Sequence, residues 1–340
     1  MTPPRFFVGA DMAATTFACS AFSAERGIIA TQDNLQNTLE GFQALAQRLS
    51  DHDMTPETTV VCIEATGVYG EAFCRFFAAL GYRLAVEPPL KVKRAFHPAG
   101  RKTDPVDSRQ IAEYAYRFYD QLSFWQPPSD IVEQVRSLLG LRERVTKSLV
   151  IHKNAHRSLQ RKPVPIEFAE QMTTELITTL NQKLVAIDAE IERVIQQDPS
   201  LHQMVQRLDM IPGVGLLLAA YYLVMTNGFA PGLQYRSQAA FLGIAPLERQ
   251  SGTITKRPRS RQYGPQHIRK LLHLAARSVC VHKKQFREYY LRKREQGKTG
   301  AVIYNNVSNK LLRILCAIAS SGKPYIADYR SVNPALLRAA

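Results

Sequence analysis

The sequence predicts a chain of the α/β plus α class, with a mixed sheet first, a helical arm next and a mostly helical C-terminal domain last. Three observations predict it. Short β-branched runs alternate with helical patterns in residues 1–128, two long amphipathic runs fill 129–200, and helical periodicity dominates 201–340. Because 340 residues are too many for one small core, we predict three domains with these boundaries.

The first region begins with three short strands joined by tight returns within residues 5–35. The later elements are a helix at 37–49, a continuous apolar strand at 58–66, a helix at about 70–80, a strand at 83–89 and a helix from Asp104. Three hairpin-linked strands followed by alternating helix and strand indicate a mixed sheet.

The second region contains two long amphipathic helices. Seam positions recur every three or four residues from Ile131 to Leu149 and from Leu176 to Val194, with Arg142 as the one charged member of the first run. The segment "QRKPVPIE" (160–167) separates the two runs. This spacing is typical of a coiled-coil arm, but each run is short, so ordinary bundle packing explains it equally well.

The third region is expected to be all-helical apart from its loops. The turn "IPGVG" (211–215) joins two helical patterns, Gly264-Pro265 opens another helix, and a final helix covers about 301–320. The "IPGVG" turn resembles a helix-hairpin-helix, whose backbone amides can hold a phosphate. A simple tight turn explains it equally well.

Basic residues are concentrated in the second half of the chain. The net charge is +15, yet residues 1–127 carry 12 Lys/Arg against 14 Asp/Glu. Between Arg249 and Lys310 there are 16 basic residues and two acids. A solvated helix face normally mixes both signs, so this asymmetry points to a polyanion, most simply nucleic acid. A membrane surface fits less well, because no lipid-anchor motif or apolar insertion face accompanies the charge.

The rest of the composition favours a cytoplasmic protein without a membrane partner. The five cysteines are scattered without a CxxC pair, as expected for reduced, buried thiols. The N-terminus lacks the pattern of a signal peptide. Apolar runs such as "LLLAAYYLVM" (216–225) are far shorter than the roughly 20 residues of a membrane span.

Four carboxylates in the first region form a candidate metal site. Asp11 and Glu64 end predicted strands, while Asp104 and Asp107 share one face at the start of a helix. Parallel neighbouring strands would bring the first two to one edge of the sheet, and a helix packed there would add the second pair. Magnesium prefers such oxygen ligands, and paired ions can stabilise both oxygens of a phosphodiester displacement. Taken singly, each residue is explained better by a cap or a surface ion pair than by a metal site.

Together, and in this order, the four carboxylates resemble the ribonuclease H–like fold of RuvC-type nucleases. His152 and His156 lie four residues apart and could chelate zinc, but no HExxH glutamate or third ligand accompanies them. Contact with RNA or DNA explains this basic helix better.

Ser251 is the candidate nucleophile of the third region, because a Ser-Gly pair precedes a run of cations. These cations, which could hold a phosphate, are Lys256, Arg257, Arg259 and Arg261, followed by Arg269 and Lys270 in the next helix. A serine hydroxyl requires activation, and His267 is 16 residues away, so a metal or a basic environment would have to supply it. Thr253, Thr255, Ser260 and Tyr263 are competing hydroxyls, and the residues alone do not choose among them.

Several motifs follow one another in a known order. They are "VGAD", "CIEATGVYG", "KTDPVDSRQIAEY", "IPGVG", "AAFLGIAP" and "SGTITKRPRSRQYGPQHIRKLL". This series resembles transposases of the insertion sequence 110 family, which includes related DNA invertases, and it covers nearly the whole chain. One departure is "DMAAT" (11–15), where the family often places a lysine shortly after the first aspartate.

The resemblance implies an RNA-guided serine recombinase. Asp11, Glu64, Asp104 and Asp107 would bind magnesium (Mg²⁺), and Ser251 would attack DNA to form a transient phosphoserine link. The partners would be donor and target double-stranded DNA and a structured, bridge-type non-coding guide RNA. The assembly would be a homotetramer, a dimer of dimers with shared active sites, acting at the bacterial nucleoid.

Two other functions remain open on the residues themselves. In a metal-only RuvC-like nuclease or junction resolvase, water would attack the phosphodiester and Ser251 would be structural. In a non-catalytic nucleic-acid-binding protein, the four carboxylates would be helix caps and surface partners.

Overall fold

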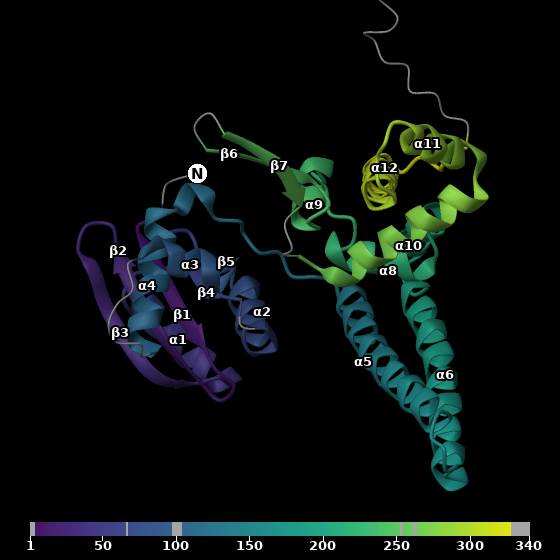
Figure 1. Ribbon diagram of the computed structural model, residues 1–340. Helices are drawn as coiled ribbons and strands as arrows, with labels where there is room; N and C mark the ends of the chain where they lie inside the picture. Colours follow the sequence, from purple (N-terminus) through teal and green to yellow (C-terminus); the bar gives the residue numbers. More distant parts are fainter. Residues whose placement is uncertain (1–3, 66, 97–103, 252–253, 261–263, 328–340) are drawn as a thin grey trace, which may run out of the picture. The chain divides into compact units, whose positions relative to one another are not determined.

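The computed structural model describes residues 4–65, 67–96, 104–251, 254–260 and 264–327 (Figure 1), and within 247–260 it describes the backbone alone. The chain divides into two compact units, residues 1–127 and 128–340, which are described separately below.

The first unit is built on a five-stranded mixed sheet. Its strands are β1 (Phe6–Met12), β2 (Thr16–Ser23), β3 (Gly27–Gln36), β4 (Thr59–Glu64) and β5 (Arg83–Glu87), in the order β3-β2-β1-β4-β5. The first three strands form an antiparallel meander, whereas β4 runs parallel to both β1 and β5. This confirms the predicted mixed sheet, and it confirms that β1 and β4 are parallel neighbours.

Helices cover both faces of this sheet (Figure 1). They are α1 (Leu39–Asp51), α2 (Glu71–Ala79), α3 (Pro89–Ala95) and α4 (Asp104–Arg117). One core joins Val8 and Ile63 to the phenylalanines of α1 and α2. The other joins Phe7 and Cys62 to Ile111 of α4. Neighbouring residues of β1 and β4 therefore enter opposite cores, which is why these strands appear as continuous apolar runs in the sequence.

The second unit begins with the two predicted long helices, α5 (Asp130–Leu159) and α6 (Glu167–Ile195), which pack side by side (Figure 1). Ser129 caps α5 by accepting a hydrogen bond from the amide of Val132. The core of the unit joins the bases of these helices to α7 (Pro199–Asp209), α8 (Leu216–Met225), α9 (Tyr235–Phe241), α10 (Gln266–His282), α11 (Lys284–Glu295) and α12 (Gly300–Ser321).

The expectation that this region is all-helical apart from its loops is wrong at the basic segment. Residues Pro246–Ser251 (β6) and Ile254–Ser260 (β7) pair as an antiparallel hairpin. The strand sequences "PLERQS" and "ITKRPRS" lack alternating apolar residues, so the period-two signal of a half-buried strand is missing. Main-chain pairing between two neighbouring segments forms this ribbon. Such pairing does not depend on apolar side chains, so the pattern of apolar residues in the sequence cannot predict it.

All five cysteines are buried as free thiols, as the sequence predicted. None of the helices in the described ranges has the length and apolar character needed to cross a membrane.

Candidate active site and nucleic-acid interface

Two of the four predicted carboxylates lie side by side at one edge of the sheet. The parallel pairing of β1 with β4 runs to Ala10 opposite Ile63, and Asp11 and Glu64 are the next residue on each strand. Neighbouring strands are about 4.8 Å apart, so the register places these two residues at the same level on adjacent strands. Both are half-buried.

Strand alternation places both carboxylates on the face that α4 covers. Phe7 of β1 and Cys62 of β4 pack in the core that includes α4, whereas Met12 and Ile63 belong to the opposite core. Successive side chains on a strand point to opposite faces. Asp11 and Glu64 therefore share the α4 face.

The helix α4 runs along β1 so that its N-terminal end lies toward Asp11. The ring of Tyr116, near the end of α4, lies 5.4 Å from the ring of Phe7. Near the start of the helix, the hydroxyl of Ser108 is hydrogen bonded to that of Ser20 at 2.8 Å, and Ser20 pairs with Gly9. From Phe7 to Gly9 to Asp11, the strand therefore advances toward the first turn of α4.

A glycine makes this close approach possible. A Cβ atom added to Gly9 would lie 2.2 Å from the backbone nitrogen of Ala112 and 2.4 Å from the carbonyl oxygen of Ser108. Asp104 and Asp107 occupy the turn just before Ser108; Asp104 is exposed and Asp107 half-buried. The fold thus brings the elements that carry all four predicted carboxylates to one edge of the sheet.

The side chains themselves do not form a closed metal site. Among the described residues, no three His, Cys, Asp or Glu side chains are gathered closely enough to hold one ion. The oxygen ligands that these residues offer and the positions of their backbones fit magnesium. In the described part of the chain, no third ligand joins His152 and His156 to form a zinc site.

Glu87 is a fifth carboxylate at this edge that the sequence analysis missed. It ends β5, pairs with Glu64 in the sheet register and is only 2% exposed. Its carboxylate accepts a hydrogen bond from Lys91 Nζ at 2.8 Å. Although burial alone favours the neutral amine, the hydrogen bonds with Glu87 and Tyr114 raise the pKa of Lys91 above its ordinary value. An acid that ends an apolar strand, "RLAVE", was the signal available in the sequence.

The second unit carries Ser251 beside the turn of the β6–β7 hairpin. Ser251 is the last residue of β6 and pairs with Ile254, the first residue of β7. Lys256, Arg257 and Arg259 belong to β7, so the hairpin brings the predicted serine and three predicted cations onto one ribbon. Arg261 lies outside the described residues.

The base of this hairpin is fixed at both strands. Before β6, the carbonyl of Ile244 accepts hydrogen bonds from the side-chain amides of Asn305 and Asn309 on α12, each at 3.0 Å. The hydroxyl of Tyr235 in turn donates to Asn309 Oδ1 at 2.9 Å. After β7, Gly264 has φ = 118°, and a Cβ there would lie 2.1 Å from the carbonyl oxygen of Phe241. The core therefore holds both ends of the segment that carries Ser251.

The remaining predicted contacts lie on α10. Arg269 is half-buried and Lys270 is exposed. Lys270 lines a cavity of about 570 Å³ between α5, α8 and α10. In the same cavity, His267 Nε2 lies 2.7 Å from a carboxylate oxygen of Glu143.

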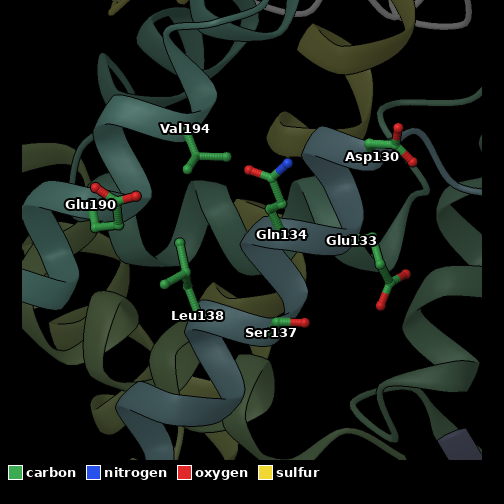
Figure 2. A pocket seen from close by; sticks show the side chains of 7 residues that line it. All are labelled: Asp130, Glu133, Gln134, Ser137, Leu138, Glu190 and Val194. Carbon is green, nitrogen blue, oxygen red and sulfur yellow. The ribbon is translucent and has the colours of Figure 1, made fainter.

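A second cavity, of about 470 Å³, lies where α5 and α6 meet. It is lined by Asp130, Glu133, Gln134, Ser137, Leu138, Glu190 and Val194. Figure 2 shows apolar Leu138 and Val194 with carboxylates around them. Glu133 and Glu190 each pair at 2.6 Å with the arginine three residues further along the same helix. An acidic lining disfavours phosphate, so this cavity does not belong to the predicted interface.

Two family models match the chain. The first is described as a transposase and is of the DEDD, IS110 type; it matches residues 8–162. The second, described as "Transposase IS116/IS110/IS902 family", matches residues 205–291. The first range includes all four predicted carboxylates, and the second includes Ser251 and the β6–β7 hairpin.

Similar proteins extend along most of the chain. The "pilin gene-inverting protein" of Moraxella bovis is 26% identical over 328 residues, which cover 94% of this chain and 98% of that protein. The protein of the same name from Moraxella lacunata is 25% identical with the same coverage. A "probable family 20 transposase" of Pseudomonas aeruginosa is 25% identical and covers 76% of this chain and 84% of its own length.

Proposed function

Because this chain carries the two transposase domains of the insertion sequence 110 family, we propose that it is an RNA-guided recombinase that cuts and rejoins donor and target DNA through Ser251. Transposition or inversion of DNA is the activity of this family. The observation that best supports the finer proposal is the position of Ser251 at the end of β6, on the same two-stranded ribbon as three cations of β7. The base of this hairpin is fixed.

In the proposed reaction, Ser251 Oγ forms a bond to phosphorus while the bond between phosphorus and one bridging oxygen breaks. The serine proton leaves, and the departing oxygen ends as a hydroxyl. Rejoining is the reverse step, in which a hydroxyl of another strand attacks the phosphoserine and restores the serine. Lys256, Arg257 and Arg259 would hold phosphates of the DNA backbone along the ribbon that carries Ser251, through charge-assisted hydrogen bonds.

Asp11, Glu64, Asp104 and Asp107 would hold Mg²⁺ at the carboxyl edge of the sheet. When bound, the metal would activate the attacking oxygen and offset the charge that develops on the phosphate. The contribution of the chain itself is to bring strand ends and a helix start to one place. That arrangement supports the assignment of these four residues together.

A structured guide RNA would select the donor and target DNA by base pairing, and a tetramer would align the two duplexes. The net charge of +17 on residues 128–340, from 32 basic and 15 acidic residues, suits binding of several polyanions.

Trapping of a covalent protein–DNA adduct tests the nucleophile. We expect the wild-type protein, incubated with Mg²⁺, guide RNA and nicked substrate DNA, to form an adduct that survives denaturation. Ser251→Ala should form none, because it lacks the attacking oxygen, while its DNA binding should persist. Asp11→Asn and Glu64→Gln should lower the rate of adduct formation by at least about 100-fold, the scale of a lost metal contribution to catalysis.

The other outcomes separate the rival functions. Cleavage by Ser251→Ala without an adduct would establish water as the nucleophile, as in a metal-only nuclease. If neither the wild type nor any variant cleaves a strand, the protein is a non-catalytic nucleic-acid-binding protein. Recombination of purified DNA in the absence of RNA would refute guidance by RNA, whatever the outcome for Ser251.

A further inference from the structure

We propose that a cluster of four cations on α11 and α12 is a contact site for the phosphodiester backbone of nucleic acid; this inference rests on the proposed function, which supplies the polyanion. The cluster, called here the α12 cation cluster, consists of Arg292, Lys293, Lys310 and Arg313. It lies outside the hairpin and α10, where the sequence placed the nucleic-acid contacts.

Three of these cations converge on one tyrosine ring. Lys310 Nζ lies 4.2 Å from the centroid of the Tyr289 ring, and Arg292 Cζ and Lys293 Nζ lie 5.8 Å and 5.9 Å from the same centroid. The contacts bring α11 and α12 together at this point. Each cation is attracted to the ring, but three like charges share it, so their mutual repulsion is concentrated there.

The fourth cation extends the cluster along α12. Arg313 Cζ lies 4.7 Å from the centroid of Tyr235, and the hydroxyl of Tyr235 is hydrogen bonded to Asn309. Leu311 and Leu312, between Lys310 and Arg313, are fully buried. The cations thus stand on a helix that is fixed by its core, which lowers the entropy lost when an anion binds.

Ion pairs do not offset the positive charge of the cluster in the part of the chain that the structure describes. Within the described residues, none of its four members forms an ion pair, whereas cations on α5 and α6 such as Arg136, Arg142 and Arg193 do. Lys310 is exposed as a residue, but neighbouring groups partly cover its amine. This partial desolvation, followed by the nearby cations Arg292, Arg313 and Lys293, lowers the pKa of Lys310 below its ordinary value. A bound phosphate would relieve this repulsion.

The geometry favours backbone contact over base recognition. The cations lie over the rings of Tyr289 and Tyr235, so these cations already occupy ring surface that a nucleic-acid base would need for stacking. Cations that contact phosphates fix the position of a nucleic acid without reading its sequence. The phosphodiester backbone is common to duplex DNA and RNA, and the experiment compares the two.

The test is the salt dependence of binding by the full-length protein. Lys310→Gln/Arg313→Gln should lower affinity at least about tenfold near 0.1 M salt. The slope of log K against log salt should become shallower by about 2, one for each lost phosphate contact. The probes are a duplex DNA and a structured RNA of matched length, each in several unrelated sequences.

Arg136→Gln/Arg193→Gln is the matched control, since it removes the same charge from arginines already paired with glutamates. Its slope should stay close to the wild-type value. Lys310→Arg/Arg313→Lys, which keeps the charge, should retain the wild-type slope. The midpoint temperature of thermal unfolding should be the same for all variants as for the wild type, because Lys310 and Arg313 are both exposed.

A cluster variant that behaves like its control on both probes would overturn the proposal. A loss on one probe alone would support it and identify the nucleic acid. Binding requires neither Ser251 nor strand cleavage, so failure to trap an adduct would refute the serine mechanism while leaving this result intact.

Discussion

Gly9 is the residue on which the carboxylate edge depends most directly, because α4 crosses β1 where this side chain is missing. Gly9→Ala should destabilise the first unit by about 3 kcal/mol, since the added Cβ would overlap backbone atoms that cannot rotate away. The displaced helix carries Asp104 and Asp107, so metal-dependent cleavage should fall as well. Urea unfolding and strand cleavage measure the two effects.

Gly140→Ala provides the matched control for this substitution. Gly140 lies inside α5, where the nearest atom to an added Cβ is the end of the Arg144 side chain, 3.7 Å away. Alanine is the better helix former, so this change should stabilise the protein by up to about 1 kcal/mol. Equal stability of Gly9→Ala and the wild type would contradict the packing described for α4.

Asn309 is the residue that ties the Ser251 hairpin to the core. Asn309→Ala removes donors to the carbonyls of Ile244 and Asn305 and leaves the hydroxyl of Tyr235 without its acceptor. We expect a loss of about 1–2 kcal/mol in unfolding free energy. The rate of adduct formation should also fall, because the serine is held less firmly. The affinity for DNA should not change.

The neighbouring Asn306→Ala serves as control, since the structure records no side-chain hydrogen bond from Asn306 to another described residue. It should keep both stability and adduct rate. If Asn309→Ala changed stability but left the adduct rate at the wild-type level, the amide would be structural only.

At the scale of elements, the α5–α6 arm explains the one charged residue in its predicted apolar seam. Arg142 Nε and a terminal nitrogen donate to the two carboxylate oxygens of Asp188 on α6, at 2.5 and 3.0 Å. These hydrogen bonds raise the pKa of Arg142 above its ordinary value. A double-mutant cycle with Arg142→Ala and Asp188→Ala should give a coupling energy of about 1 kcal/mol.

The pair Arg193 and Glu190 is the comparison for this cycle. It lies within one helix and is more exposed, at 60% and 41%. Its coupling energy should be smaller than that of Arg142 and Asp188, because water screens an exposed pair. Equal coupling energies for the two pairs would show that the contact between helices adds nothing to the arm.

The β6–β7 hairpin shows where reasoning about single elements was insufficient. Helical periodicity located α5, α6, α10 and α12 because each buries a stripe of apolar side chains, and the repeat is visible in the sequence. The hairpin is a ribbon joined by main-chain pairing, and its sequence is basic. The sequence identified Ser251 and its cations as neighbours but not the structure that presents them.

At the scale of the whole molecule, the sequence by itself determined the chemistry available to each half of the chain. It gave the first unit its carboxylates at strand and helix ends, and the second unit its excess of cations. Charge and residue type are properties of single residues, so both can be determined from the sequence without knowledge of the fold. The first matched transposase domain contains the four carboxylates and continues through α5, and the second contains Ser251 and the cations of β7.

Only the tertiary structure decided which of these groups are neighbours. Parallel pairing put Asp11 beside Glu64, the missing side chain of Gly9 let α4 approach, and the register added Glu87, which the sequence left inside an ordinary strand. Packing of α11 on α12 brought Lys310 to the same tyrosine ring as Arg292 and Lys293, which lie about 17 residues earlier in the chain. Such proximities arise from contacts between distant segments, and no local pattern of residues encodes the distance between two side chains.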